Sequence, residues 1–160
     1  MNRVDRICRH PLWRDCVEQI RALEQDRAFC RHDLEHLLAV GRLAYIENLE
    51  RGLDVDKELI YAAALLHDAG RHLQYTQNIP HDQAGARLAG EIMEDCGFSP
   101  EEIAQVQDAI LHHRRRDSDG GDGLAGLLYR ADKASRACLF CKAEPECNWS
   151  PAQKNMSLRA

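Results

Sequence analysis

The sequence has no long apolar run and no apolar segment near its start. No stretch approaches the roughly 18 consecutive apolar residues of a membrane-spanning helix. Residues 1–6 lead directly into further charged residues, without the apolar segment of a signal peptide. We therefore expect a cytoplasmic protein with no membrane partner.

Positive charge is not in excess either. The 21 Lys and Arg residues are outnumbered by 26 Asp and Glu residues, and the formal net charge is -5. A chain with net negative charge is repelled by phosphate backbones, which argues against general nucleic-acid binding. A local basic pocket for a phosphate group remains compatible with this composition.

The sequence also lacks strand-like alternation of apolar and polar residues, internal repeats, low-complexity tracts and linkers. Its 160 residues are enough for one domain with a core that needs no disulfide support. We predict a single all-α domain over residues 1–160, a bundle of about six helices. Residues 141–160 are predicted to form a short, irregular tail that bears cysteines.

Apolar spacing, caps and breakers locate the predicted helices. Asp54 or Asp56 can cap the third, and Ser99 with Glu102 forms a capping box before the fifth. Gly97 is well placed to stop the fourth helix. The six helices are predicted at about residues 11–27, 33–49, 56–68, 81–96, 100–113 and 124–140.

Histidine and aspartate residues occupy inward positions on three of these helices. His67 and Asp68 end the almost wholly apolar stretch 59–66, His36 lies on an inward stripe of its helix, and Asp132 has apolar neighbours one turn away. Burying a carboxylate and an imidazole together is costly unless something compensates for lost hydration. A divalent cation would compensate, since both groups are ordinary metal ligands. The pattern therefore predicts a metal within the helical core.

The order of these residues resembles the HD superfamily of metal-dependent phosphohydrolases. The resemblance covers about residues 30–136 and rests on the segments HDLEH at 32–36, AALLHDAGR at 63–71 and YRADK at 129–133. It implies one divalent transition metal (Mn, Fe, Co, Ni or Zn) bound by His36, His67, Asp68 and Asp132.

The chain departs from the usual pattern of this superfamily at two positions. The family usually has Ile after the motif aspartate and often Lys after the glycine, where this chain has Ala69 and Arg71. Arg71 keeps a cation where phosphate would bind and adds a bidentate fork. His32 matches a histidine of one branch and could be a ligand, a cap or a supporting residue.

Three further histidines raise the question of a second metal. His81 begins a predicted helix, and His112 and His113 end one. Branches of the superfamily with two metals have extra histidines in these two places, so the resemblance implies that these residues could hold a second ion. Alternatively, His112 and His113 are surface residues that favour the C-terminal dipole of their helix. The helical register does not decide which of His112 and His113 would be the ligand.

Cationic side chains follow the motifs closely. The resemblance makes Arg71, Arg130 and Lys133 candidate phosphate contacts. The basic run at residues 114–116 is either a solvated helix end or a further contact to an anionic substrate.

The resemblance implies a hydrolase of phosphate esters or anhydrides, acting on a nucleotide or related small phosphorylated metabolite. A metal-bound hydroxide would attack the phosphoryl group, with His67, Asp68 and Arg71 as catalytic residues. Two alternatives are a di-iron oxygenase of the same superfamily and a non-catalytic sensor of a phosphorylated ligand. The number of subunits is not predicted.

The seven cysteines form a second chemical pattern. Cys138, Cys141 and Cys147 follow one another at a spacing that allows thiolates to chelate a soft cation. A structural zinc ion would need a fourth ligand, for which Cys30 is the best candidate, and an iron–sulfur cluster would need one too. The alternative is free thiols, as expected in a reducing compartment.

Overall fold

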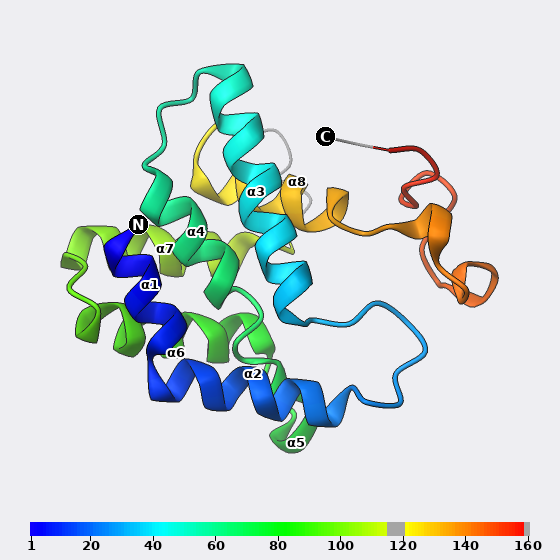
Figure 1. The fold of residues 1–160 in the computed structure, drawn as a ribbon, viewed down its shortest axis with the longest axis horizontal. Helices are drawn as coiled ribbons and strands as arrows, with labels where there is room; N and C mark the ends of the chain where they lie inside the picture. The colour runs from blue at the N-terminus through cyan, green and yellow to red at the C-terminus, as the bar shows by residue number, and fades with distance from the viewer. Residues whose placement is uncertain (115–120, 159–160) are drawn as a thin grey trace.

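The computed structural model describes residues 1–114 and 121–158, and the regular structure in these ranges is entirely helical (Figure 1). Two short 3-10 turns, η2 (Cys138–Phe140) and η3 (Glu144–Glu146), follow the last α-helix. The α-helices are α1 (Asn2–Arg9), α2 (Pro11–Leu23), α3 (Leu34–Arg51), α4 (Lys57–Leu66), α5 (Arg71–Gln77), α6 (His81–Asp95), α7 (Pro100–His112) and α8 (Leu124–Ala134). In the described ranges, no helix combines the length and the apolarity needed to cross a membrane.

Helix α4 is the centre of the bundle. It packs against α1, α3, α6, α7 and α8, and its residues Ala62–Leu66 have almost no exposed surface. Trp13 of α2 donates its indole hydrogen to the carbonyl oxygen of Leu65, at 2.9 Å. The apolar stretch in the sequence is therefore a helix buried on every side, and it delivers the residues that follow it into the core.

The predicted all-α fold is confirmed, and six helices overlap the predicted ones, although α2 ends at Leu23 and not at about residue 27. The predicted caps are also present, since Asp56 accepts hydrogen bonds from backbone amides of α4 and Ser99 forms a capping box with Glu102. Ser99 and Pro100 begin α7 as their spacing indicates.

Two short helices were not predicted. Helix α1 is held by tertiary contacts, because Arg3 donates to Glu58 of α4 and to Glu102 of α7, each at 2.7 Å. An isolated helix of this length is marginal in water, so local sequence signals were too weak to indicate it. Helix α5 ends at Asn78, which adopts a left-handed conformation with φ of 56°.

The prediction that the last helix reaches residue 140 is wrong. Helix α8 ends at Ala134, and the tail satisfies its terminal carbonyl groups. The buried side-chain amide of Asn155 donates to the carbonyl oxygens of Lys133, at 2.7 Å, and Arg136, at 2.9 Å. This cap comes from a distant part of the chain, so helical periodicity alone could not place the end.

The turn after α4 packs tightly against the start of α6. A Cβ atom added at Gly70 would lie 2.4 Å from the carbonyl oxygen of His81 and 2.5 Å from the amide nitrogen of Gly85. Both neighbours are backbone atoms, so they can yield only by moving the helix. The glycine therefore sets the distance between the His67–Asp68 turn and His81.

We expect Gly70→Ala to lower the free energy of unfolding by about 3 kcal/mol through overpacking. Urea denaturation of this variant and of Gly123→Ala measures the difference. A Cβ atom at Gly123 would meet no atom within 4 Å, and its φ is negative, so the control should lose about 1 kcal/mol or less. Equal losses in the two variants would show that the close approach at Gly70 is not constraining.

Candidate metal centre

The four predicted ligands of the first metal converge at the end of α4. The distances below connect Nε2 of each histidine with Oδ2 of Asp68 and Oδ1 of Asp132. His67 lies 3.0 Å from Asp68 and 3.8 Å from Asp132, while His36 lies 3.4 Å from Asp68 and 3.5 Å from Asp132. Ligand atoms about 2.1 Å from a shared ion lie roughly 3–4 Å apart. The geometry therefore suits one divalent ion.

A second group of possible ligands lies on the other side of Asp68. Oδ1 of Asp68 is 3.6 Å from Nε2 of His81, which is 3.3 Å from Nε2 of His113. Asp68, His81 and His113 are all buried, and their ligand atoms lie within 4.8 Å of one another. Asp68 thus directs one carboxylate oxygen to each group, as a carboxylate does when it bridges two ions.

The structure distinguishes the two neighbouring histidines at the end of α7. His113 has 1% of its surface exposed and faces His81. His112 instead directs Nδ1 to the carbonyl oxygen of Asp108, at 2.8 Å, and its side chain is 33% exposed. Of the two, only His113 joins the cluster.

The four buried histidines of the cluster are oriented in the same way, through Nδ1. In His67, His81 and His113 this nitrogen lies 2.5–2.7 Å from a carbonyl or amide oxygen, which can only accept a hydrogen bond. In His36 it faces the Ser135 hydroxyl, which itself donates to the carbonyl oxygen of Asp132. In a neutral imidazole the proton therefore sits on Nδ1, and Nε2 offers its lone pair to a metal. These supporting roles of Ser135 and of Gln74, the partner of His81, were not predicted.

Three buried atoms at the centre of the cluster have no hydrogen-bond partner among the described residues. They are Nε2 of His67, Oδ2 of Asp68 and Oδ1 of Asp132. Leaving one such atom unsatisfied costs about 1–3 kcal/mol, and more when it is charged. Ion pairs within the cluster, such as His67 with Asp68 at 3.0 Å, offset part of this cost. A cation coordinated by these atoms would remove the rest, so the residues present fit a divalent metal.

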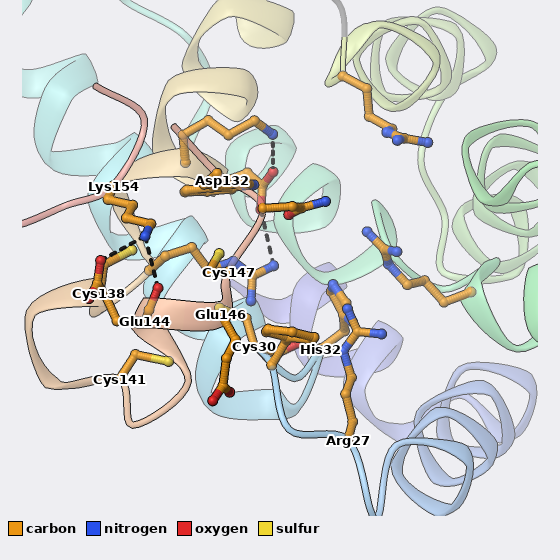
Figure 2. Close-up of a pocket in the computed structure, with 17 residues that line it drawn as sticks. Arg27, Cys30, His32, Asp132, Cys138, Cys141, Glu144, Glu146, Cys147 and Lys154 are labelled. Atoms are coloured by element: carbon orange, nitrogen blue, oxygen red, sulfur yellow. Dashed lines mark hydrogen bonds and ion pairs between the residues drawn. The ribbon is translucent and has the colours of Figure 1, made fainter. Parts of the chain in front are cut away.

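A cavity of about 530 Å³ adjoins the cluster at Asp132, which lines it (Figure 2). Asp132 lies on one side of it, His32 and Arg27 lie on another, and residues of the tail form a further wall. The cations that line this cavity are Arg27, Arg71, Arg114, Lys133, Arg136 and Lys154.

Three comparisons with known proteins agree with this geometry. A model of the HD domain matches residues 33–143.

The chain belongs to the HD domain family.

Two sequence relatives and one solved structure are similar to this HD protein. An uncharacterized protein of Clostridium beijerinckii is 42% identical over 142 residues, covering 89% of this chain and 88% of that protein. Ribonuclease Y of Enterococcus faecalis is 27% identical over 147 residues, which are 92% of this chain but only 26% of that enzyme. The solved structure of a predicted HD superfamily hydrolase from an uncultured Thermotogales bacterium has a TM-score of 0.63 and 23% identity. That likeness covers 89% of this chain and 81% of the other.

Electrostatics keep three histidines of the HD cluster neutral near pH 7. Burial lowers the pKa of His36 to about 4, of His81 to about 3 and of His113 to about 4. His67 differs, because Asp68 and Asp132 outweigh its burial and raise its pKa to about 9. The metal-free protein therefore holds a proton at His67, and an ion that binds there must displace it.

The candidate phosphate contacts do not all reach the cavity. Arg71 lines it and donates from Nε to Oδ1 of Asp68, at 2.8 Å, and Lys133 donates to Oδ2 of Asp132, at 2.6 Å. Arg130 is directed elsewhere, toward Glu47 and the carbonyl oxygen of Gly121. Of the basic run at 114–116, Arg114 lines the cavity, and the other two positions lie outside the described residues.

Arg136 is a cavity residue that the sequence analysis missed. Its Nη2 lies 3.1 Å from Nε2 of His36 and 3.6 Å from Oδ1 of Asp132. An ion bound by His36 would take the place of this donor. The one sequence signal was its position four residues after Asp132, which places the two residues on the same face of the predicted helix.

His32 lines the cavity and forms part of a buried network. Its Nδ1 lies 2.5 Å from Glu24, which also accepts a hydrogen bond of 2.6 Å from the Tyr75 hydroxyl. Burial by itself would raise the pKa of Glu24, but the hydrogen bonds from His32 and Tyr75 outweigh it and lower that pKa to about 2. His32 is therefore a supporting residue by geometry, with its ring held edge-on to His36.

We expect the two neighbouring histidines of α7 to differ in metal binding. His113→Ala should lose about one ion per chain, because it removes a ligand atom that points at His81, and Asp68→Ala should lose both ions. His112→Ala, the matched control, should retain the wild-type content. Elemental analysis after dialysis against Mn²⁺ or Fe²⁺ measures this. Equal content in the His113→Ala and wild-type proteins would exclude the second site.

We also expect the Glu24 network to make stability depend on pH. Its folded-state pKa is depressed, so the stabilisation is complete above the ordinary pKa, 4.5, and is lost as the pH falls toward about 2. Glu24→Gln should cost about 2 kcal/mol at pH 7 and progressively less below pH 4.5.

Denaturant unfolding between pH 7 and pH 2.5 tests this, with the exposed Glu18→Gln as the control. A cost that stays constant across this range would contradict the assignment.

Proposed function

We propose that this HD protein hydrolyses phosphate esters or anhydrides, with a nucleotide or a related small phosphorylated metabolite as the substrate. The observation that carries the proposal is Asp68, whose two oxygens face two separate groups of buried histidine and aspartate atoms, one of which includes Asp132 of the cationic cavity. The names of the relatives agree with hydrolysis, but ribonuclease Y is matched over only 26% of its length. Its RNA substrate is therefore not transferred to this chain.

We propose Mn, Fe, Co, Ni or Zn as the bound metal, in one or two ions. Imidazole nitrogen and carboxylate oxygen suit all of these. When bound, such ions would supply an activated water and neutralise the oxygens of a phosphoryl group. The protein's own contribution is to keep His36, His81 and His113 neutral by burial and to hold each Nε2 toward the centre.

The cationic side chains would bind and orient the substrate. Arg71 is anchored by Asp68, so its remaining guanidinium donors are held at the cavity in a fixed direction. Lys133 and Arg136 both contact Asp132 and also line the cavity. A phosphoryl group bound near Arg71, Lys133 and Arg136 would meet several positive charges, which stabilise the charge that develops during its transfer. The volume of about 530 Å³ lies within the range of small-molecule sites.

We expect purified protein loaded with Mn²⁺, Fe²⁺ or Co²⁺ to release inorganic phosphate from members of a nucleotide and sugar-phosphate panel. His67→Ala should abolish release together with metal binding. Arg71→Lys should retain metal and lower kcat/KM about 100-fold, because lysine lacks the bidentate fork. His112→Ala, outside the cavity, should keep the wild-type rate.

Two other outcomes would replace this proposal. Oxygen consumption by iron-loaded protein without phosphate release would favour the di-iron oxygenase. Tight nucleotide binding without turnover under every metal would favour the sensor.

A further inference from the structure

Four of the seven cysteines gather at one wall of the cavity. Cys30 comes from the loop between α2 and α3, and Cys138, Cys141 and Cys147 come from the tail. Figure 2 shows these side chains together on the tail side of the cavity, and Figure 1 shows that the loop and the tail lie on the same side of the bundle. The remaining cysteines, Cys8, Cys16 and Cys96, pack in the apolar core.

Short backbone turns present the tail cysteines toward the same space. The amide of Cys141 donates to the carbonyl oxygen of Cys138 at 3.0 Å, which closes η2. The amide of Glu144 then donates to Cys141, and the amide of Cys147 to Glu144, at 3.1 and 3.2 Å. These successive tight turns keep the three tail cysteines along one wall of the cavity.

The tail has almost no apolar core of its own. In residues 138–158 the buried residues are Cys138, Ala143 and Asn155. The large apolar side chains are largely exposed, with Phe140 at 72% and Leu158 at 85%. A segment this poor in apolar burial needs a crosslink or a metal to hold a defined shape.

The charges around Cys30 act on its thiol in both directions. Burial raises the pKa of Cys30, and ionised Cys141, Cys138 and Cys147 would raise it further, whereas Arg136 lowers it. Each of the three tail sulfurs is therefore near enough to Cys30 for its thiolate to repel a thiolate at Cys30. A divalent ion converts that repulsion into attraction, with the thiol protons released to solvent.

We propose that Cys30, Cys138, Cys141 and Cys147 bind one zinc ion, which fastens residues 138–158 to the loop before α3 as a wall of the cavity. In tetrahedral coordination the sulfur atoms lie roughly 3.8 Å apart, since each Zn–S bond is about 2.3 Å. In the described ranges no three of these sulfurs lie within 4.8 Å of one another. Zinc binding therefore requires the turns of the tail, as well as the loop that holds Cys30, to bring these sulfurs closer together. The proposal does not depend on hydrolytic activity.

Cobalt substitution tests the site. Co²⁺ bound by thiolates gives a near-ultraviolet sulfur-to-metal charge-transfer band, whereas Co²⁺ at the histidine and aspartate cluster does not. We expect the band in wild-type protein, its loss in Cys141→Ser, and its retention in Cys8→Ser, a control in which the half-buried cysteine is remote from the cavity. Elemental analysis should show about one zinc ion fewer in Cys141→Ser than in Cys8→Ser.

Two measurements on the wild-type chain avoid variants that fold poorly. Titration with a mercurial reagent should release about one zinc ion as four thiols react. Trypsin should cut at Lys142 and Lys154 faster after the zinc is removed. Wild-type protein that lacks the charge-transfer band and has zinc only at the histidine cluster would overturn the proposal, whether or not it hydrolyses phosphate. An unchanged band in Cys141→Ser would overturn it as well.

Discussion

The buried carboxylate of Asp68 is the constraint on which the site depends. It is 2% exposed, follows a helix that is apolar on every side, and has imidazole groups facing both of its oxygens. An isolated charge in such a place would cost several kcal/mol, so the surrounding structure has to supply positive charge. Arg71 supplies part of it, and the unsatisfied atoms at the centre mark the place for a metal to supply the rest.

The helices around Asp68 are arranged to preserve this geometry. Backbone carbonyl groups one turn before His67 and His113 fix the direction of each ring, so the ligand atoms are set by the helices themselves. Gly70 allows α6 to approach closely enough for His81 to reach the second oxygen of Asp68. The second group of buried atoms therefore depends on backbone packing, together with the Gln74 side chain that orients His81.

The cavity, unlike the cluster, has much of its wall built from segments outside the packed helices. The end of α8, the loop before α3 and the tail supply its walls, and Asn155 joins two of them by capping α8. The HD motif carries the ligand residues, whereas the tail, most of which lies beyond the matched residues 33–143, completes the shape of the pocket. Proteins that share the motif can therefore differ in what they bind.

The sequence by itself determined the six principal helices, the cap at Ser99 and the residue types that form the cluster. These features depend on neighbours within one or two helical turns, which spacing reveals. Only the tertiary structure decided that His113 rather than His112 faces His81, that Arg130 turns toward Glu47, and that Arg136 enters the cavity. Those outcomes depend on the angles at which helices cross and on where α8 ends, and the latter is set by Asn155 across space.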